Sequence, residues 1–282
     1  MIESEPFIPS KALELEYDRE LKALITPMLK EVSEEVLKAY RTDFAQDGMD
    51  DIERLIEKLK EKFDRLYREK GAEAAKKMVM KQVRFCKATF KRVMARLLPE
   101  EKANKVEKSV ISKGLDAIII ASVYENVTLI KSLCDKFFEQ ITGSVVRSVQ
   151  NGINIKQLTE EIFRYGEMTK KRARLIALDQ TRKTYMAISR QNLKDAGFNK
   201  VMWRHSGGGE PRPYHIRKWD GVSGKEDGHP NGLNGFIFDL NNPPVIEHAY
   251  VPKTSKGTYR GERRGLPAEL PNCKCVMVAI LN

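Results

Sequence analysis

The sequence contains little cysteine and lacks a long uninterrupted hydrophobic run. Its 282 residues include only four cysteines, Cys86, Cys134, Cys273 and Cys275. They are too few and too widely spaced for a disulfide framework. The N-terminal residues are acidic and contain no hydrophobic signal region. The most apolar stretch, residues 115–124, has about half the length needed to span a bilayer. These absences predict a soluble protein that is made in a reducing compartment and has no membrane partner.

Positive charge is concentrated in one segment of the chain. The net charge is +11, and residues 65–97 alone contain 11 basic and 2 acidic side chains. Five of these basic residues share one side of an expected helix: Lys77, Lys81, Arg84, Lys87 and Lys91. Such a stripe attracts polyanions, with nucleic acid as the first candidate. A solvated helix face, or a dock for an acidic protein partner, is the alternative interpretation.

Helical periodicity dominates residues 10–197. Apolar residues at steps of three and four predict several amphipathic helices: 11–40, from 50 or 51 to 71, 72–97, 100–142 and 169–196. We expect Pro27 to kink or divide the first helix and Gly71 to end the second. We also expect Gly166 to close a short helix that begins near Leu158, and Thr169 to cap the last helix. Cys86 and Cys134 lie among apolar residues and are interpreted as core residues.

The pattern changes after Phe198, where glycine becomes frequent. Short apolar runs predict strands at 201–203, 236–238 and 275–280. Residues 252–268 are basic and poor in apolar side chains, which predicts a mobile loop. The fold class is therefore α+β. We expect a helical domain at 1–150, helices at 151–197 that lead into the next module, and a small β-rich domain with long loops at 198–282.

Five ordered motifs stand in the second half of the chain. They are Asp179-Gln180 between basic residues, Trp203-Arg204, Arg212-Pro213-Tyr214-His215 followed by Asp220-Gly221, Phe238 with Pro243-Pro244, and Pro271-Asn272-Cys273-Lys274-Cys275. In this order and spacing, over about residues 150–282, they resemble the phage Mu F-like minor head proteins, also called the phage head morphogenesis family. Two departures are Gly207–Pro211, where the family usually has an acidic turn, and Lys274, where it usually has Arg.

The resemblance implies a structural protein of a phage virion rather than an enzyme. A protein of this family would be made in the bacterial host cytoplasm and join the head near the portal. Its expected partners are the portal protein, a scaffold or major capsid protein, and packaged double-stranded DNA. A metal-dependent nuclease or toxin-like enzyme is the alternative function. Residues 215–235 are glycine-rich and lack the final helix of a ββα-metal nuclease. The Gly207-Gly208-Gly209 loop lacks the Gly-Lys-Ser/Thr ending of a phosphate-binding loop.

The two C-terminal cysteines form the candidate metal site. Cys273 and Cys275 are two positions apart, so on a strand both thiols point to the same face. Together they offer half of a tetrahedral zinc site. His215, which belongs to a family motif, is the first candidate for a further ligand, and His205 is the second. His229 and His248 are weaker candidates. The alternative is that both thiols are packed core groups and His215 is hydrogen-bonded, with no cofactor.

The remaining motif residues have structural interpretations. Trp203 is expected to anchor the core of the β-rich domain. Arg212 is expected to form a salt bridge, with Asp220 as one candidate partner. Asp179 and Gln180 are expected to form a buried polar bridge from their helix to the β-rich domain.

Overall fold

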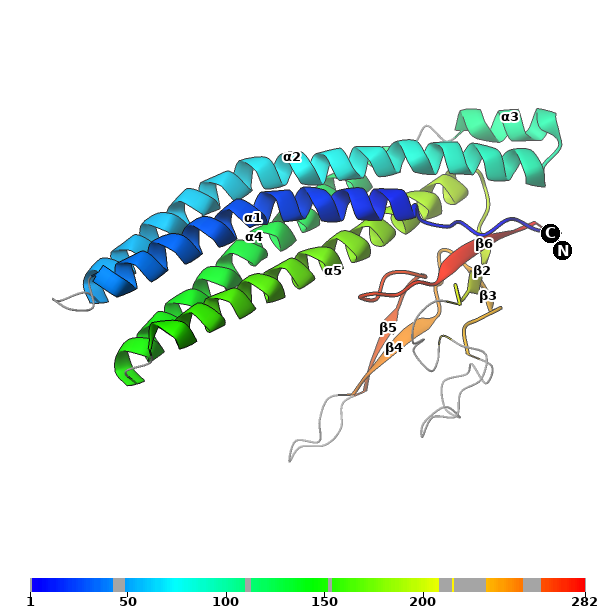
Figure 1. Ribbon diagram of the computed structural model, residues 1–282. Coiled ribbons are helices and arrows are strands. Elements are labelled where there is room, and N and C mark those ends of the chain that lie inside the picture. The colour runs from blue at the N-terminus through cyan, green and yellow to red at the C-terminus, as the bar shows by residue number, and fades with distance from the viewer. Residues whose placement is uncertain are drawn as a thin grey trace. The chain divides into compact units, whose positions relative to one another are not determined.

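The computed structural model describes residues 2–42, 49–109, 113–151, 154–207, 215, 232–250 and 260–281. Five helices occupy most of the chain: α1 (Lys11–Thr42), α2 (Met49–Leu97), α3 (Glu100–Ser109), α4 (Lys113–Asn151) and α5 (Ile155–Asp195). Short strands follow them toward the C-terminus (Figure 1). The predicted α+β class, with long helices first and a small sheet last, is confirmed.

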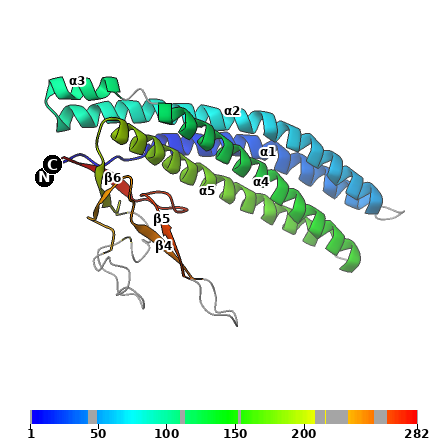
Figure 2. The ribbon, with the colours of Figure 1, turned by 180° about the vertical axis from the view of Figure 1, so that it is seen from behind.

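The first compact unit is a bundle of antiparallel helices. It comprises Lys11–Met80 and Ile120–Gln180, which are α1 and the greater parts of α2, α4 and α5. These helices run side by side and alternate in direction, as both ribbon views show (Figures 1 and 2). Apolar residues at helical spacing are buried along each helix, among them Leu21, Ile25, Val32, Ile56, Phe63, Ile130, Phe137, Phe138 and Ile162. The periodicity of the sequence is therefore the origin of the bundle.

Glycine and proline interrupt these helices less than the sequence predicted. α2 continues through Gly71, and α5 continues through Gly166, so both predicted helix ends are wrong. A Cβ atom on Gly71 would stand only 3.1 Å from Cγ2 of Ile130, which shows that this glycine allows close packing of α4 against α2. Thr169 lies inside α5 and bonds to the carbonyl of Tyr165, so it is not a cap. Pro27 lies inside α1 and does not divide it.

The predicted helix over residues 100–142 also differs from the structure. Two helices, α3 and α4, replace it, and α4 runs past Gly143 as far as Asn151. By length and composition alone, Gly114–Gln150 is apolar enough to cross a membrane, and only 22% of its most apolar window is buried. Its second half contributes Ile130, Phe137 and Ile141 to the bundle core. Over those residues α4 is a packed bundle helix.

The second compact unit contains the sheets. It comprises Met1–Ser10, Lys81–Ile119 and Thr181–Asn282. Four strands form an antiparallel sheet in the order β1-β6-β2-β3: β1 (Ile2–Glu3), β6 (Val276–Leu281), β2 (Lys200–Arg204) and β3 (Ile237–Asp239). In the central pair, Trp203 lies opposite Met277. A separate antiparallel pair is formed by β4 (Val245–Tyr250) and β5 (Arg260–Arg264). The strand β5 lies within the segment predicted to be a mobile loop, so that prediction is wrong for these residues.

The central strands β2 and β6 are buried on both faces. Val201, Trp203, Met277 and Ala279 belong to one apolar cluster, which also contains side chains from α2 and α5. Met202, Val278 and Ile280 form a smaller cluster on the opposite face. Since side chains alternate along a strand, this division follows directly from the sequence.

The N-terminal arm is an edge of this sheet, which the sequence did not indicate. Ile2 and Glu3 pair with Leu281 and Ile280. Beyond the strand, the amide of Phe7 donates to the carbonyl of Met277 at 2.9 Å. The Phe7 ring is buried and stacks against Phe90 of α2. The expectation that all strands lie after residue 198 is therefore wrong for β1.

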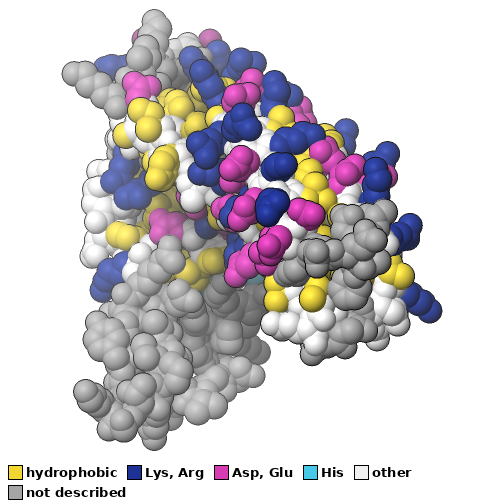
Figure 3. All heavy atoms as spheres, turned by 90° about the vertical axis from the view of Figure 1, so that its left-hand side faces the viewer, with side chains coloured by type: hydrophobic (Ala, Val, Ile, Leu, Met, Phe, Trp, Pro, Cys, Tyr) yellow, Lys and Arg dark blue, Asp and Glu magenta, His cyan; other side chains and the backbone are white. Residues whose placement is uncertain are grey.

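Charged side chains of both signs cover the helical bundle. On the face drawn in Figure 3, lysine and arginine side chains are interspersed with aspartate and glutamate side chains, and hydrophobic side chains lie between them. Ion pairs such as Lys62–Glu31 and Arg147–Glu161 connect neighbouring helices on the surface. This mixture of signs contrasts with the last part of α2, where residues 74–97 contain basic but no acidic side chains.

Candidate metal centre

Two consecutive turns place the C-terminal cysteines. The amide of Cys273 donates to the carbonyl of Leu270 at 3.0 Å, which closes a turn with Pro271 and Asn272 at its centre. Proline presets the first central position, and asparagine tolerates the positive φ of 58° found at the second. In the preceding turn, the amide of Glu269 donates to the carbonyl of Leu266 across Pro267 and Ala268. The Pro-Asn-Cys motif is therefore a turn that directs Cys273 before β6 begins.

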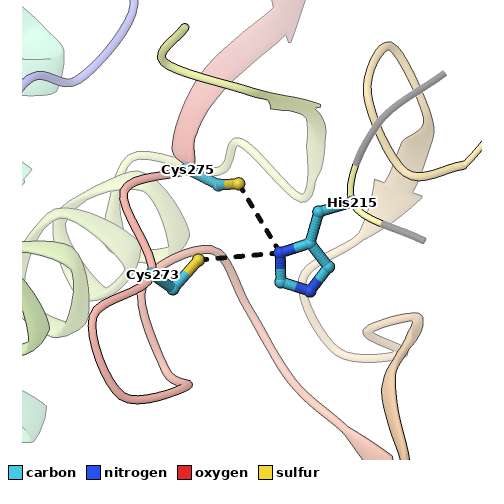
Figure 4. A group of neighbouring side chains, drawn as sticks. All are labelled: His215, Cys273 and Cys275. Carbon is cyan, nitrogen blue, oxygen red and sulfur yellow. Dashed lines mark hydrogen bonds between the residues drawn. The ribbon is translucent and has the colours of Figure 1, made fainter. Parts of the chain in front are cut away.

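Three potential metal ligands converge beside these turns. The Sγ atoms of Cys273 and Cys275 lie 3.8 and 3.7 Å from Nδ1 of His215. All three donor atoms lie within 4.8 Å of one another, and all three residues are buried. In Figure 4 both thiols point toward the same ring nitrogen. The structure thus brings together the pair of cysteines and the histidine that sequence analysis placed first.

The imidazole of His215 is held from its other side. Its Nε2 lies 3.3 Å from the carbonyl oxygen of Ile246, in β4. A carbonyl oxygen only accepts, so Nε2 carries the proton and Nδ1 presents its lone pair to the sulfurs in the neutral ring. The ring also contacts Trp203 edge to face, with centroids 5.0 Å apart. Trp203 is fully buried in the core of this unit, as predicted for an anchor residue.

Electrostatics favour a thiolate at this site. A hydrogen bond from Cys275 holds the pKa of Cys273 well below its usual value. Burial opposes that shift, and the neighbouring imidazole of His215 adds to it. The thiol of Cys86 shows the opposite behaviour, because burial in the apolar core raises its pKa. A thiolate is the form that binds metal, whereas the protonated Cys86 is a packing residue, as predicted.

The other candidate ligands are not part of this cluster in the described part of the chain. His205 lies at the end of β2, where its Nδ1 accepts a hydrogen bond from the amide of Gly207 at 3.1 Å. His229 and the side chain of His248 lie outside the described residues, as do Arg212, Asp220 and Gly221. Their predicted functions remain predictions.

Within the part of the chain that the structure describes, the hydrogen bonds of Gln180 go to another helix and not to the sheets. Its side chain donates to Glu125 at 2.9 Å and accepts from Asn126 at 3.2 Å, and both residues belong to α4. Asn126 also accepts a hydrogen bond from the Tyr17 hydroxyl of α1 at 2.9 Å. The predicted polar bridge to the β-rich domain is therefore wrong for Gln180. This residue belongs instead to a polar network inside the helical bundle.

The basic stripe is on the surface of α2, opposite its buried seam. Lys77, Arg84, Lys87 and Lys91 are exposed, and Lys81 is half-buried. Lys77 forms an ion pair with Glu20, whose hydrogen bond raises the pKa of the lysine. The seam residues Val79, Cys86, Phe90 and Val93 are buried, as the periodicity predicted. Cys134, the other predicted core cysteine, is also buried, 3.5 Å from Asp64.

Two supporting features of the site could not be found from the sequence. One is the carbonyl of Ile246, since a backbone oxygen leaves no side-chain signal. The other is Gly265, because a Cβ atom there would collide with the Glu269 carboxylate and with Cδ1 of Ile246. The amide of Gly265 donates to the carbonyl of Pro244 at 3.1 Å. Glycine therefore lets the chain before the cysteine turns approach β4 closely.

Comparison with known proteins identifies the second half of the chain. Residues 139–278 match the family described as Phage Mu protein F like protein. Residues 139–278 are thus similar to the Phage Mu F-like family. The match confirms the resemblance drawn from the motifs. The family suggests a broad assignment to phage head morphogenesis.

One curated relative is an uncharacterized protein of Haemophilus influenzae. It is 27% identical over 158 residues, which cover 56% of this chain and 28% of that protein. The matched region therefore spans little more than a quarter of the relative's length. No solved structure shows significant similarity to this chain.

Proposed function

We propose that this Phage Mu F-like protein is a minor head protein that docks to the portal during head assembly. The observation that carries the proposal is the match of residues 139–278 to the family. A head protein of this kind acts by binding other proteins, so its function requires an exposed contact surface. The helices provide a candidate for that surface.

The first half of α4 has an apolar face that its neighbours leave uncovered. Ile120 and Tyr124 are 69% and 75% exposed and lie one helical turn apart. Ala117 and Ala121 are exposed on the same side of the helix. Large exposed apolar side chains that cluster on one face are typical of a protein-binding surface. We call Ala117, Ile120, Ala121 and Tyr124 the α4 face and propose that it contacts the portal.

Co-expression with the portal protein of the same genome tests the docking. We expect the two proteins to co-purify, and Ile120→Asp with Tyr124→Asp to abolish the complex because the charges would be desolvated in the interface. The matched control is Phe163→Asp with Met168→Asp, which changes exposed apolar residues on α5. Retention of the complex by the α4 variant would contradict the assigned surface. A wild-type chain that never co-purifies with the portal would contradict the docking itself.

The basic stripe of α2 supports a second proposed contact, with packaged DNA. Three of its exposed members, Arg84, Lys87 and Lys91, lie on a face opposite the buried seam. The predominance of one charge sign favours a polyanion over a neutral partner. Because each neutralised phosphate releases counterions, DNA affinity should fall steeply with salt concentration.

Charge reversal of the stripe tests the DNA contact. Changing Arg84, Lys87 and Lys91 to Glu should weaken binding to a random duplex and flatten its salt dependence. Lys58, Lys60 and Lys62, elsewhere on α2, changed to Glu provide a control with an equal change in net charge. Circular dichroism should show unchanged helicity, since the seam is untouched. Equal affinity and equal salt slope in wild type and stripe variant would indicate a solvated or protein-binding face instead.

A further inference from the structure

We propose that Cys273, Cys275 and His215 bind a zinc ion that ties the start of β6 to β4. The assignment rests on the geometry of the three residues and is independent of portal docking and DNA binding. The chain itself positions the ligands: the turns before β6 orient the cysteines, and the hydrogen bond to the Ile246 carbonyl orients His215.

The ligand separations match those of a zinc site. With zinc at about 2.3 Å from sulfur and about 2.0 Å from nitrogen, tetrahedral angles place sulfur and nitrogen about 3.5–3.6 Å apart. The two distances here are 3.8 and 3.7 Å. Small inward movements of the side chains would bring all three atoms into coordination distance. Two soft sulfurs and an imidazole nitrogen favour zinc over the harder calcium and magnesium ions.

A hydrogen bond from Cys275 to Cys273, together with a single hydrogen bond to Nδ1, accounts less well for the symmetry of this cluster. The lone pair of Nδ1 accepts one thiol proton in good geometry, yet the two sulfurs lie at nearly equal distances from that atom. A cation located between the three donors satisfies all of them at once. The hydrogen bond from Nε2 to the Ile246 carbonyl is the contact that metal-binding histidines make with the nitrogen that does not coordinate.

The location of the site gives the ion a structural function. Cys273 and Cys275 precede β6 of the four-stranded sheet, whereas Ile246 belongs to the separate β4–β5 pair. His215 is distant from both in sequence. An ion bound here would therefore link three chain segments and both sheets. The three residues are buried, which is typical of a structural site, and they leave one position of a tetrahedron for a fourth donor.

Metal analysis of the native chain tests the proposal. The 282-residue chain, carrying a tag without histidine and purified without chelators, should contain stoichiometric zinc. X-ray absorption at the zinc edge should show sulfur neighbours at about 2.3 Å together with a nitrogen neighbour. Absence of zinc from the native chain, with none retained after incubation with zinc and desalting, would overturn the proposal. Zinc surrounded only by oxygen and nitrogen would also overturn it.

Substitutions then assign the ligands. Cys273→Ser, Cys275→Ser and His215→Gln should each lose the zinc, whereas Cys134→Ser and His205→Gln should retain it. Cobalt(II) provides a second readout that does not require a stable variant, because thiolate-to-cobalt absorption bands should form in the native chain and disappear when zinc is added. The assignment would be refuted if the zinc content were unchanged in all three ligand variants. It would also be refuted if the native chain contained a disulfide between Cys273 and Cys275.

Discussion

The helical bundle and the sheet-containing unit are stabilised in different ways. The bundle buries long apolar stripes, so each helix is held by many similar contacts spread along its length. The sheet-containing unit depends on a few particular positions: two proline turns, Gly265, the N-terminal strand and the His215 cluster. The stability lost on a single substitution in the bundle should thus depend mainly on the side-chain volume removed. Around the cysteines, the stability lost should depend on backbone geometry and on which ligand is changed.

Two spectroscopic signals separate the two units in an experiment. Both tryptophans, Trp203 and Trp219, lie after residue 198, so tryptophan fluorescence reports on the sheet-containing unit. Far-ultraviolet circular dichroism reports mainly on the long helices. A substitution in the bundle should first shift the circular dichroism transition, and one near the cysteines should first shift the fluorescence transition.

The largest effect is expected from a cavity in the bundle core. Phe137 is fully buried and contacts Phe138 edge to face. Phe137→Ala should lower the free energy of unfolding by about 3–5 kcal/mol, because it removes apolar contacts and leaves a void. Thermal melts followed by circular dichroism measure the change, with the exposed Phe163→Ala as control. Equal shifts of the melting temperature in the two variants would show that buried side-chain volume is not the main determinant of stability in this bundle.

A smaller effect is expected from the polar network of the same bundle. Asn126 accepts from the Tyr17 hydroxyl and donates to Gln180. Asn126→Ala should cost about 1–3 kcal/mol, because buried polar partners lose their hydrogen bonds. In the double variant Asn126→Ala with Tyr17→Phe, the second change should cost less than Tyr17→Phe alone. Additive costs in this double-mutant cycle would show that the two side chains are not coupled.

The same substitution at two glycines compares the units directly. Gly265→Ala places a Cβ atom against the Glu269 carboxylate and the buried Ile246 side chain, and the resulting strain should cost about 1–3 kcal/mol in the fluorescence transition. At Gly71 the added atom is 3.1 Å from Ile130. There the gain of about 1 kcal/mol in helix propensity offsets part of the strain, so Gly71→Ala should be nearly neutral. If Gly71→Ala destabilised the protein more than Gly265→Ala, the proposed difference between the two units would be reversed.

The sequence predicted the bundle well because its information is periodic. Each apolar stripe specifies a buried face, and the helix boundaries at Lys11, Leu97 and Asp195 agree with the predicted ones to within one residue. The errors at Gly71 and Gly166 have one cause: tertiary packing outweighs the weak helix propensity of a single glycine. The polar network was missed because the partners of Gln180 lie on another helix, more than fifty residues away.

The sheet-containing unit was less predictable because its key contacts are non-periodic. The prediction that the two cysteine thiols face the same side came from their spacing. His215 was chosen as a further ligand because it belongs to a family motif. The pairing of Ile2 with Leu281 left no signal, since a two-residue strand is too short to show alternation. Likewise, β5 is basic and glycine-containing, so neither β-branched residues nor apolar alternation marked it as a strand.

A smaller effect than that at Gly265 is expected from the backbone of the turn before Cys273. Asn272 adopts a φ of 58°, which glycine accepts freely and alanine accepts at a cost. Asn272→Ala and Asn272→Gly both remove the asparagine side chain, so the difference between them isolates the effect of the Cβ atom. We expect the glycine variant to be the more stable of the two, by about 1 kcal/mol, in the fluorescence transition. Zinc retention, measured in parallel, should also be higher in the glycine variant, because the turn directs the Cys273 thiol toward His215. An alanine variant that equals or exceeds the glycine variant in both measurements would show that this turn does not determine the position of the thiol.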